Sequence, residues 1–148
     1  MKIIFTDIDG VLNSTKGEEP YESDMEVEKL LLLKQLIDET NADGIVITSD
    51  RRTSYVDMLA KLAAFAHFDI PILGQTRTES EVDLNDNRGK QILDYLADTK
   101  REIENIVIFD DMDDGISELL FEQFIQTDRR NGLTLENKEQ AKNILNQQ

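Results

Sequence analysis

The spacing of apolar and polar residues along the chain predicts strands and helices in alternation. Five short apolar runs are typical of strands, and most are apolar throughout, as expected for strands buried on both faces of a sheet. They lie at residues 3–5, 45–47, 70–73, 106–109 and 124–125. Pro71 favours the sheet edge for the third run, because proline has no N–H to donate to a neighbouring strand.

Between these runs, apolar residues recur at the spacing of one helix face. The predicted helices extend from a Ser23 cap to about residue 39, from about residue 54 to 65, over 89–97, around 116–120 and from about 135 to 145. Ser23 and Glu26 have the spacing of a capping box, Asn41 and Gly44 end the first helix, and Thr134 is a candidate cap of the last. Apolar strands alternating with helices predict a three-layer α/β fold, a parallel sheet with helices on both faces.

Composition narrows the picture without pointing to a function. The 148 residues suit one domain, and we expect a single domain over residues 1–148. The absence of cysteine excludes disulfides, thiolate chemistry and zinc–cysteine sites. The net charge of -15 argues against extended nucleic-acid binding or an anionic membrane as the main partner, since both favour a basic surface. The first apolar run is too short for a signal peptide or a membrane span, so we expect a cytoplasmic protein.

Polar side chains follow three of the predicted strands at the point where each strand ends. These residues are Asp7, Asp9, Thr48, Ser49, Asp110 and Asp111. In parallel sheets of this class, ligands bind beyond the carboxyl ends of the strands, where the strand order reverses. We therefore expect three segments that are far apart in the sequence to bring their polar residues to one rim of the sheet.

The residues at this rim suit a magnesium ion and a phosphate. Clustered carboxylates repel one another unless a cation binds, and Mg²⁺ prefers oxygen ligands. Such a centre favours phosphate substrates, because the ion neutralises phosphoryl oxygens. Thr48 and Ser49 can donate hydroxyl hydrogen bonds to a phosphate, and Gly10 lets backbone N–H groups approach it. Arg88 or Lys90, at the start of a predicted helix, can supply a positive charge.

Asp7 and Asp9 are separated by one residue and can divide the chemistry between them. One ionised carboxylate can attack phosphorus and form an aspartyl-phosphate. The other, two residues further on, can protonate the leaving group and then activate water. This pattern predicts a phosphomonoesterase.

Four segments of the chain resemble, in order, the motifs of the haloacid dehalogenase (HAD) superfamily of phosphohydrolases. They are FTDIDGVLN, IVITSD, the Arg88-Gly89 pair before a helix, and IVIFDDMDD. The later stretch FIQTDRRNGLT is similar, more specifically, to the small HAD domains of Swiss army knife RNA-repair proteins. The resemblance implies a Rossmann-like sheet with strand order 5-4-1-2-3, which would bring Asp7 beside Asp110.

The resemblance also implies roles for the rim residues. Asp7 would be the nucleophile and a metal ligand, and Asp9 the general acid/base with its backbone carbonyl on the metal. Asp110 and Asp111 would complete the magnesium site, and Asp114 is a further acidic candidate near it.

Two phosphate-binding assignments stay open at this point. Either Thr48 or Ser49 matches the second motif and would hold the phosphate. Arg88 is the first choice for the cation of the third motif and Lys90 the second, and either would steady the transferring phosphoryl group.

The expected substrate is a small phosphorylated metabolite or nucleotide, or a phosphorylated nucleic-acid end. The chain has room for at most a minimal cap over the rim, and open sites of this superfamily tend to serve large substrates or to be closed by a partner subunit. A homodimer is therefore left open. Arg51 and Arg52 either reach a second phosphate or form surface ion pairs; with Arg129 and Arg130 they could form a small basic spot.

Other functions fit the sequence less well. A calcium loop needs oxygen donors at its first, third and fifth positions, and the fifth residue counted from Asp7 is Val11. A phosphoacceptor module that is phosphorylated once, without turnover, shares the acidic pocket, but no aspartate ends the third predicted strand. A scaffold domain of the same fold would not need all the motif residues that are present.

Overall fold

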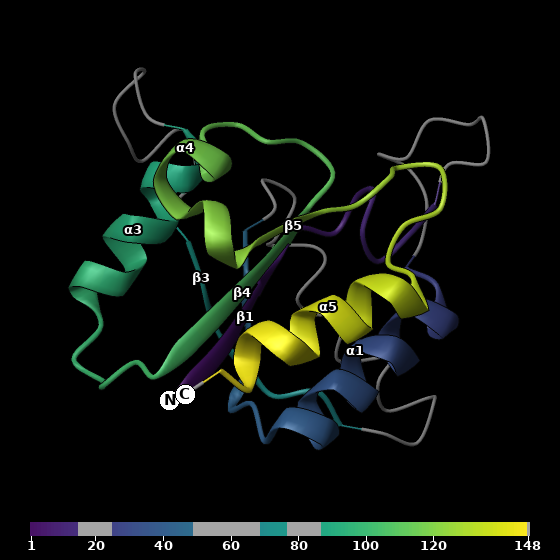
Figure 1. The fold of residues 1–148 in the computed structure, drawn as a ribbon, viewed down its shortest axis with the longest axis horizontal. Helices are drawn as coiled ribbons and strands as arrows, with labels where there is room; N and C mark the ends of the chain where they lie inside the picture. Colours follow the sequence, from purple (N-terminus) through teal and green to yellow (C-terminus); the bar gives the residue numbers. More distant parts are fainter. Residues whose placement is uncertain (15–24, 49–68, 77–86, 148) are drawn as a thin grey trace.

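The protein is built on a five-stranded parallel sheet, seen in the computed structural model, which describes residues 1–14, 25–48, 69–76 and 87–147 (Figure 1). The strands lie in the order β3-β2-β1-β4-β5. Their bounds are β1 Lys2–Thr6, β2 Gly44–Ile47, β3 Ile72–Gln75, β4 Asn105–Asp110 and β5 Phe124–Gln126. All four neighbouring pairs are parallel. This confirms the α/β fold and the strand order that the sequence and its resemblance predicted.

Helices cover both faces of this sheet (Figure 1). Their bounds are α1 Val27–Thr40, α3 Arg88–Asp98, α4 Ile116–Leu120, the short 3-10 helix η3 Phe121–Gln123, and α5 Leu135–Leu145. Helices α1 and α5 pack side by side on one face, and α3 and α4 lie together on the other (Figure 1). None of the helices in the described ranges is long and apolar enough to cross a membrane.

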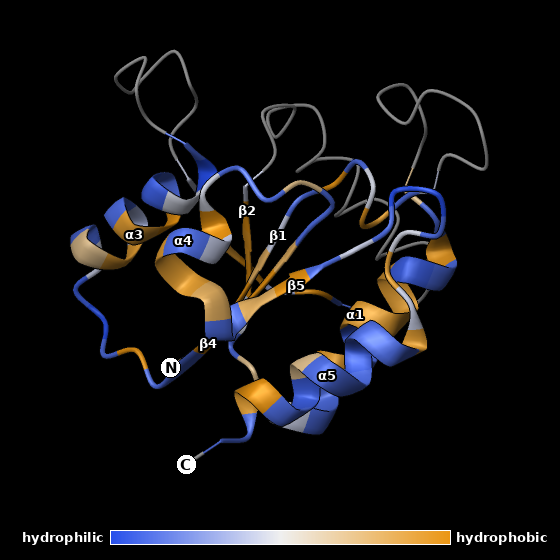
Figure 2. Cartoon of the chain, turned by 45° about the horizontal axis from the view of Figure 1, so that its top comes forward, coloured by the Kyte–Doolittle hydropathy of each residue, from blue (hydrophilic) through white to orange (hydrophobic). Residues whose placement is uncertain are grey.

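Alternate residues of the central strands divide the core into two halves. In β1, Ile4 faces the core under α1 and α5, whereas Ile3 and Phe5 face the core under α3 and α4. Both sets are buried, which explains why the central strands are apolar at consecutive positions between their ends. Figure 2 shows the result: the strands and the inner sides of the helices are hydrophobic, and the outer sides are hydrophilic.

Of the three helix-end signals that the sequence predicted, two are confirmed. Thr134 caps α5 in a complete capping box with Asn137, and Asn41 ends α1 in the left-handed conformation with φ 58°. The predicted box of Ser23 and Glu26 is wrong. Glu26 is itself the N-cap of α1 and makes no side-chain cap; its carboxylate instead accepts a hydrogen bond from the Ser14 hydroxyl at 2.5 Å.

The edge strand begins two residues later than its apolar run suggests. Residues 70–73 were expected to form it, but β3 is Ile72–Gln75. Pro71 precedes it, and its carbonyl accepts the N–H of Ile45 at 2.9 Å although its nitrogen cannot donate. The predicted edge position is confirmed. The helix predicted from about residue 54 lies outside the described residues. Ser23 itself also lies outside them, and Glu26 is the N-cap in the place predicted for Ser23.

Candidate active site

Asp7 is the first residue beyond β1, the central strand of the sheet. Its backbone N–H donates to the Phe109 carbonyl at 3.0 Å, so the pairing with β4 continues one residue past the strand. The N–H of Ile8 donates to Asp7 Oδ1 at 2.8 Å and orients the carboxylate. Asp7 is therefore a buried carboxylate on a rigid backbone at the rim of the sheet.

Asp110 and Asp111 approach Asp7 from the end of the neighbouring strand. One carboxylate oxygen from each of the three residues lies within 4.8 Å of the others. The N–H of Met112 donates to Asp110 Oδ1 at 3.0 Å and holds that side chain in place. Because β1 and β4 are parallel neighbours, two segments about a hundred residues apart deliver their acids to the same point.

The burial of these acids has an electrostatic cost. Burial is the main cause that raises the pKa of Asp7 to about 6, against the lowering effect of Arg88. Burial, followed by the charge of Asp7, raises the pKa of Asp110 to about 8. In both groups burial, more than the neighbouring carboxylates, disfavours the charged form, and Arg88 offsets only part of this effect. A cation that binds between the two carboxylates would offset more of it.

The guanidinium of Arg88 lies against Asp7 and Asp110. Its NH1 atom lies 2.8 Å from Asp110 Oδ2, 3.7 Å from Asp7 Oδ1 and 3.4 Å from Thr48 Oγ1. Its side chain is only 12% exposed. Lys90 is exposed, and its backbone N–H donates to Asn87 Oδ1 at 2.9 Å. Of the two cations that the sequence proposed for this site, the structure therefore brings Arg88 to the carboxylates.

The first turn of α3 is held in position by the segment before α4. The Asp114 carboxylate accepts the N–H of Arg88 at 3.1 Å, and the Asp114 carbonyl accepts the N–H of Gly89 at 3.2 Å. Gly89 lies so close to Gly115 that a Cβ would be 2.5 Å from the Gly115 carbonyl oxygen. Asp114, the further acidic candidate near the metal, thus fixes the start of the helix that carries Arg88.

Asp9 lies in the loop after β1 and is buried. The Asn13 side chain donates to Asp9 Oδ1 at 3.1 Å and accepts the Gly10 N–H at 2.9 Å. Gly10 has φ 81°, and a Cβ there would lie 2.6 Å from Asp111 Cγ, so glycine is required on both counts. The loop thus places Asp9 next to the acidic cluster, and the side-chain amide of Asn13 orients the Asp9 carboxylate.

Thr48 follows β2 and is buried at the same rim. Its N–H donates to the Thr6 carbonyl at 3.0 Å, which continues the pairing of β2 with β1. Its hydroxyl oxygen accepts from Arg88, so the hydroxyl proton is directed elsewhere. Ser49, the alternative phosphate-binding residue, lies outside the described residues, as do Arg51 and Arg52.

Comparison with known proteins identifies the family. Residues 3–138 match the family model described as the HAD domain in Swiss Army Knife RNA repair proteins. The chain belongs to this family. No curated protein and no solved structure matches it. Membership supports phosphatase-like or other hydrolase chemistry at the level of the superfamily.

The acidic cluster of this HAD domain fits the magnesium ion that HAD domains usually use. Asp7, Asp110 and Asp111 provide an all-oxygen set of anionic donors, which is the chemistry that Mg²⁺ selects. Burial raises the pKa of both Asp7 and Asp110 although Arg88 lowers them, so a bound cation would further favour the charged carboxylates.

Two residues that organise the HAD site were missed by sequence reasoning. Asn13 is the last residue of the FTDIDGVLN segment, but the sequence indicated no role for its side chain. Thr127, after β5, donates its hydroxyl to the Gly10 carbonyl at 2.7 Å, and its N–H to the Asp110 carbonyl at 2.9 Å. Nothing in the sequence indicates this role of Thr127, because the residue is distant in the chain from both of its partners.

Proposed function

We propose that this HAD domain is a magnesium-dependent phosphomonoesterase that works through an aspartyl-phosphate on Asp7. The observation that carries the proposal is the meeting of Asp7, Asp110 and Asp111 within 4.8 Å beside the guanidinium of Arg88. An acidic centre with one buried arginine suits a dianionic group that must be bound and attacked. Magnesium, when held by these three carboxylates and the Asp9 carbonyl, would neutralise phosphoryl oxygens.

Asp7 supplies the nucleophile. One of its oxygens would bond to phosphorus as the bond from phosphorus to the ester oxygen breaks, leaving an acyl phosphate on the protein. The hydrogen bond from the Ile8 N–H orients Asp7 Oδ1. The hydrogen bond from the Asp7 N–H to the Phe109 carbonyl ties the Asp7 backbone to β4. Such fixed positioning is a main source of rate in phosphoryl transfer.

Asp9 supplies the proton. In the first half of the reaction it would protonate the departing ester oxygen, and in the second it would take a proton from the water that attacks the aspartyl-phosphate. The hydrogen bond that Asn13 donates to Asp9 Oδ1 at 3.1 Å orients this carboxylate in the loop after β1. Water attack releases inorganic phosphate and restores Asp7.

Arg88 and Thr48 bind the transferring group. Arg88 contacts the carboxylates of both Asp7 and Asp110, so a phosphoryl group bound at Asp7 would lie next to the guanidinium. Thr48 accepts from Arg88 and can donate its own hydroxyl proton to a phosphoryl oxygen. Ser49 and Lys90 remain proposals for the same role.

Two substrate classes are proposed, a small phosphorylated metabolite or nucleotide and a phosphorylated nucleic-acid end. The description of the matching family as RNA repair proteins supports the second class. The net charge of -15 opposes binding along an extended nucleic acid, but it does not prevent the site from binding a single terminal phosphate.

Phosphate release from a substrate panel tests the proposal. The panel holds p-nitrophenyl phosphate, mononucleotides, sugar phosphates, and oligonucleotides phosphorylated at the 3′ or the 5′ end. Each is assayed with magnesium and with a chelator, and Asp7→Asn is the control. Release that needs magnesium and is lost in the control is the expected result. If the protein is phosphorylated once and does not turn over, it is a phosphoacceptor module and not an enzyme. If there is neither phosphate release nor phosphorylation, the domain is a scaffold.

A further inference from the structure

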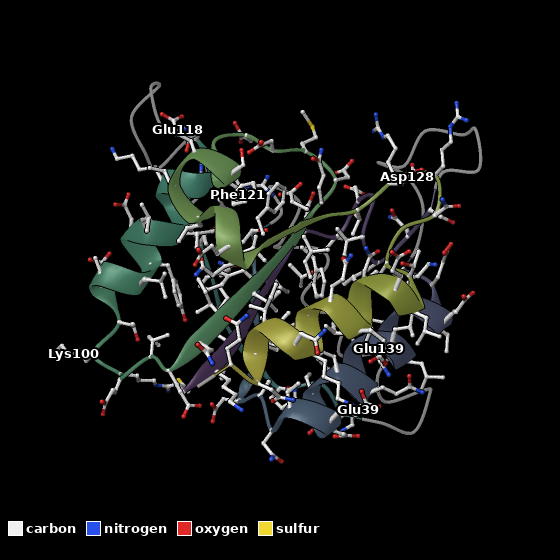
Figure 3. The ribbon with its side chains drawn as sticks, in the orientation of Figure 1. Glu39, Lys100, Glu118, Phe121, Asp128 and Glu139 are labelled. Atoms are coloured by element: carbon white, nitrogen blue, oxygen red, sulfur yellow. The ribbon has the colours of Figure 1, made fainter. Side chains whose placement is uncertain are left out.

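The turn after β5 carries two adjacent arginines on a rigid frame. Asp128 and Gly132 form an antiparallel bridge, and the N–H groups of Asn131 and Gly132 donate to the Asp128 carbonyl at 3.0 and 2.7 Å. The Asp128 carboxylate accepts the N–H of Arg130 at 2.9 Å. Figure 3 labels Asp128 between the end of β5 and the start of α5. Arg129 and Arg130 therefore lie on a turn closed by its own hydrogen bonds.

This turn is attached to both acidic loops of the site. Thr127 immediately before it bonds to the carbonyls of Gly10 and Asp110 at 2.7 and 2.9 Å. Leu133 immediately after it donates its N–H to the Val11 carbonyl at 2.7 Å. The turn, the loop that carries Asp9 and the end of β4 thus form one hydrogen-bonded unit, and the turn has a fixed position relative to the nucleophile.

Among the described residues, two arginines contact the carboxylate cluster, and they differ in exposure. Arg88 pairs with Asp7 and Asp110 and is 12% exposed. Arg129 Nε lies 3.7 Å from Asp111 Oδ2, and the Arg129 side chain is 46% exposed. A buried arginine suits the reacting phosphoryl group. A half-exposed arginine, one carboxylate further out, suits a part of the substrate that extends toward solvent.

The charge of the protein makes such a residue useful. With a net charge of -15, the molecule repels anionic substrates at long range. A fixed arginine at the rim opposes that repulsion where the substrate enters. Its planar guanidinium offers several N–H donors that match phosphate oxygens.

We propose that Arg129, on the turn between β5 and α5, binds a second phosphate group of the substrate next to the monoester that Asp7 attacks. The proposal rests on the proposed phosphatase function and adds a substrate class to it: molecules with two phosphate groups on the same sugar. A nucleoside bisphosphate and the phosphodiester of a nucleic-acid end both carry this chemistry. Arg130, exposed beside Arg129, adds positive charge to the same place.

A matched series of probes tests the proposal. Each probe has the same reacting 3′-monoester. Adenosine 3′-monophosphate has no second phosphate, adenosine 3′,5′-bisphosphate has a second monoester, and a 3′-phosphorylated diadenosine dinucleotide has a diester. The corresponding 5′ series is assayed beside it. In the wild type we expect kcat/KM to be about tenfold or more higher when a second phosphate is present, the value of one charged hydrogen bond.

Three variants separate binding from structure. Arg129→Ala should bring the ratio of kcat/KM between two-phosphate and one-phosphate probes to about one, and Arg129→Lys should keep part of it. Arg101→Ala is the control, because Arg101 is an exposed arginine in the loop before β4, at the opposite end of the sheet, and its loss changes the net charge equally. An Arg129 that only steadies Asp111 would lower kcat/KM for all probes alike, and that result overturns the proposal.

Equilibrium binding separates this proposal from the proposed function. The dissociation constants of the same probes are measured for Asp7→Asn, with and without Arg129→Ala, in magnesium. A preference for two phosphates that disappears with Arg129 supports the proposal even if no probe is hydrolysed, in which case the proposed phosphatase fails alone. Equal constants for all probes overturn the second-phosphate site. A preference confined to the dinucleotide identifies the diester of a nucleic-acid end, and one shared by the bisphosphate identifies any second phosphate.

Discussion

At the scale of single residues, the site depends on carboxylates kept in a place that disfavours their charge. Asp7 and Asp110 are buried beside one another, and burial raises the pKa of each. Arg88 offsets part of this cost through its contacts with both. Functional sites commonly hold such perturbed groups, because the same arrangement that costs stability prepares the site for a charged ligand.

Asp7→Asn should abolish phosphate release with magnesium while leaving the fold intact. The amide keeps the shape of the side chain and the acceptor for the Ile8 N–H but cannot attack phosphorus. Without metal, the variant should unfold at the same temperature as the wild type or higher, because the amide carries no charge to be desolvated. Phosphate release and thermal unfolding in a chelator measure the two effects. Turnover that survives the substitution would exclude the covalent mechanism.

Asp9→Asn should slow turnover by roughly two to four orders of magnitude, the usual contribution of a general acid/base. The amide oxygen still accepts the hydrogen bond from Asn13, so the loop is expected to stay in place. The loss should be larger for a sugar phosphate than for p-nitrophenyl phosphate, because an alkoxide leaving group needs a proton more than a nitrophenolate does. Equal losses for the two substrates would remove Asp9 from the role of acid.

At the scale of elements, the first turn of α3 decides where Arg88 points. The helix can approach the segment before α4 so closely only because residue 89 is glycine: a Cβ would lie 2.5 Å from the Gly115 carbonyl oxygen. Asn87 caps the helix by accepting the Lys90 N–H, and Asp114 accepts the Arg88 N–H. Arg88 is thus positioned by an inter-element contact that involves no ligand of the site.

Gly89→Ala should lower both stability and activity. Overpacking against a backbone carbonyl typically costs about 1–3 kcal/mol, and a shift of about 1 Å at a catalytic group can cost about a hundredfold in rate. Denaturant unfolding and phosphate release measure the two effects.

Gly74→Ala in β3 is the matched control for this substitution. There a Cβ would meet the Tyr95 hydroxyl at 3.1 Å, the far end of a side chain that can move. A Gly89→Ala protein with wild-type stability and rate would show that the close approach does not position Arg88.

At the scale of the whole molecule, acidic charge dominates, and the fold gathers part of it at the buried rim. The net charge is -15, and the acids at positions 7, 110 and 111 share one small volume. The helices and strands that enclose them are packed on apolar cores above and below the sheet, so the molecule can tolerate the repulsion. The cost should appear as a dependence of stability on pH and on magnesium.

The metal-free protein should become less stable as the pH rises from about 4 to about 8. The folded state holds protons on Asp7 and Asp110 up to pKa values of about 6 and about 8, whereas the unfolded chain releases them near 3.8. Stability from these protons is therefore complete below the unfolded pKa and is lost as the pH passes through the folded values. Urea unfolding in a chelator across this range measures the slope.

Asp110→Asn and magnesium test the origin of this slope. Asp110→Asn removes the group with the larger shift, so its stability should depend less on pH than that of the wild type. Magnesium at pH 8 should recover stability in the wild type and less in the variant. If the two proteins had the same slope, the repulsion would be spread over the surface and not concentrated at the rim.

Most of the elements could be predicted because they depend on local patterns. The apolar runs marked all five strands, and the spacing and caps marked α4 and α5 at the residues observed. Errors occurred where a distant contact outweighed the local signal. Glu26 bonds to Ser14 in place of completing a capping box, and β3 begins after Pro71, whose carbonyl accepts the N–H of Ile45 in β2.

The candidate site could be predicted less completely than the elements. The acids and Thr48 were identified because each follows an apolar strand, and parallel strands end at a common rim. Arg88 and Lys90 could not be separated from spacing alone, since both lie in the first turn of α3. Asn13 and Thr127 were missed because their hydrogen bonds to the site depend on loop conformations that carry no simple pattern.

For the described residues, the sequence by itself determined which segments are strands, which are helices and which strand ends carry acids. These features follow from short continuous apolar runs, from the 3.6-residue period of helices and from local polarity. The family resemblance added the order of the strands. Only the tertiary structure decided that Arg88 contacts Asp7 and Asp110, and that Arg129 stands beside Asp111 on a turn bonded to the Gly10 and Asp110 loops. The physical reason is that these contacts join residues far apart in the chain, whose distances depend on how the layers pack and not on any local signal.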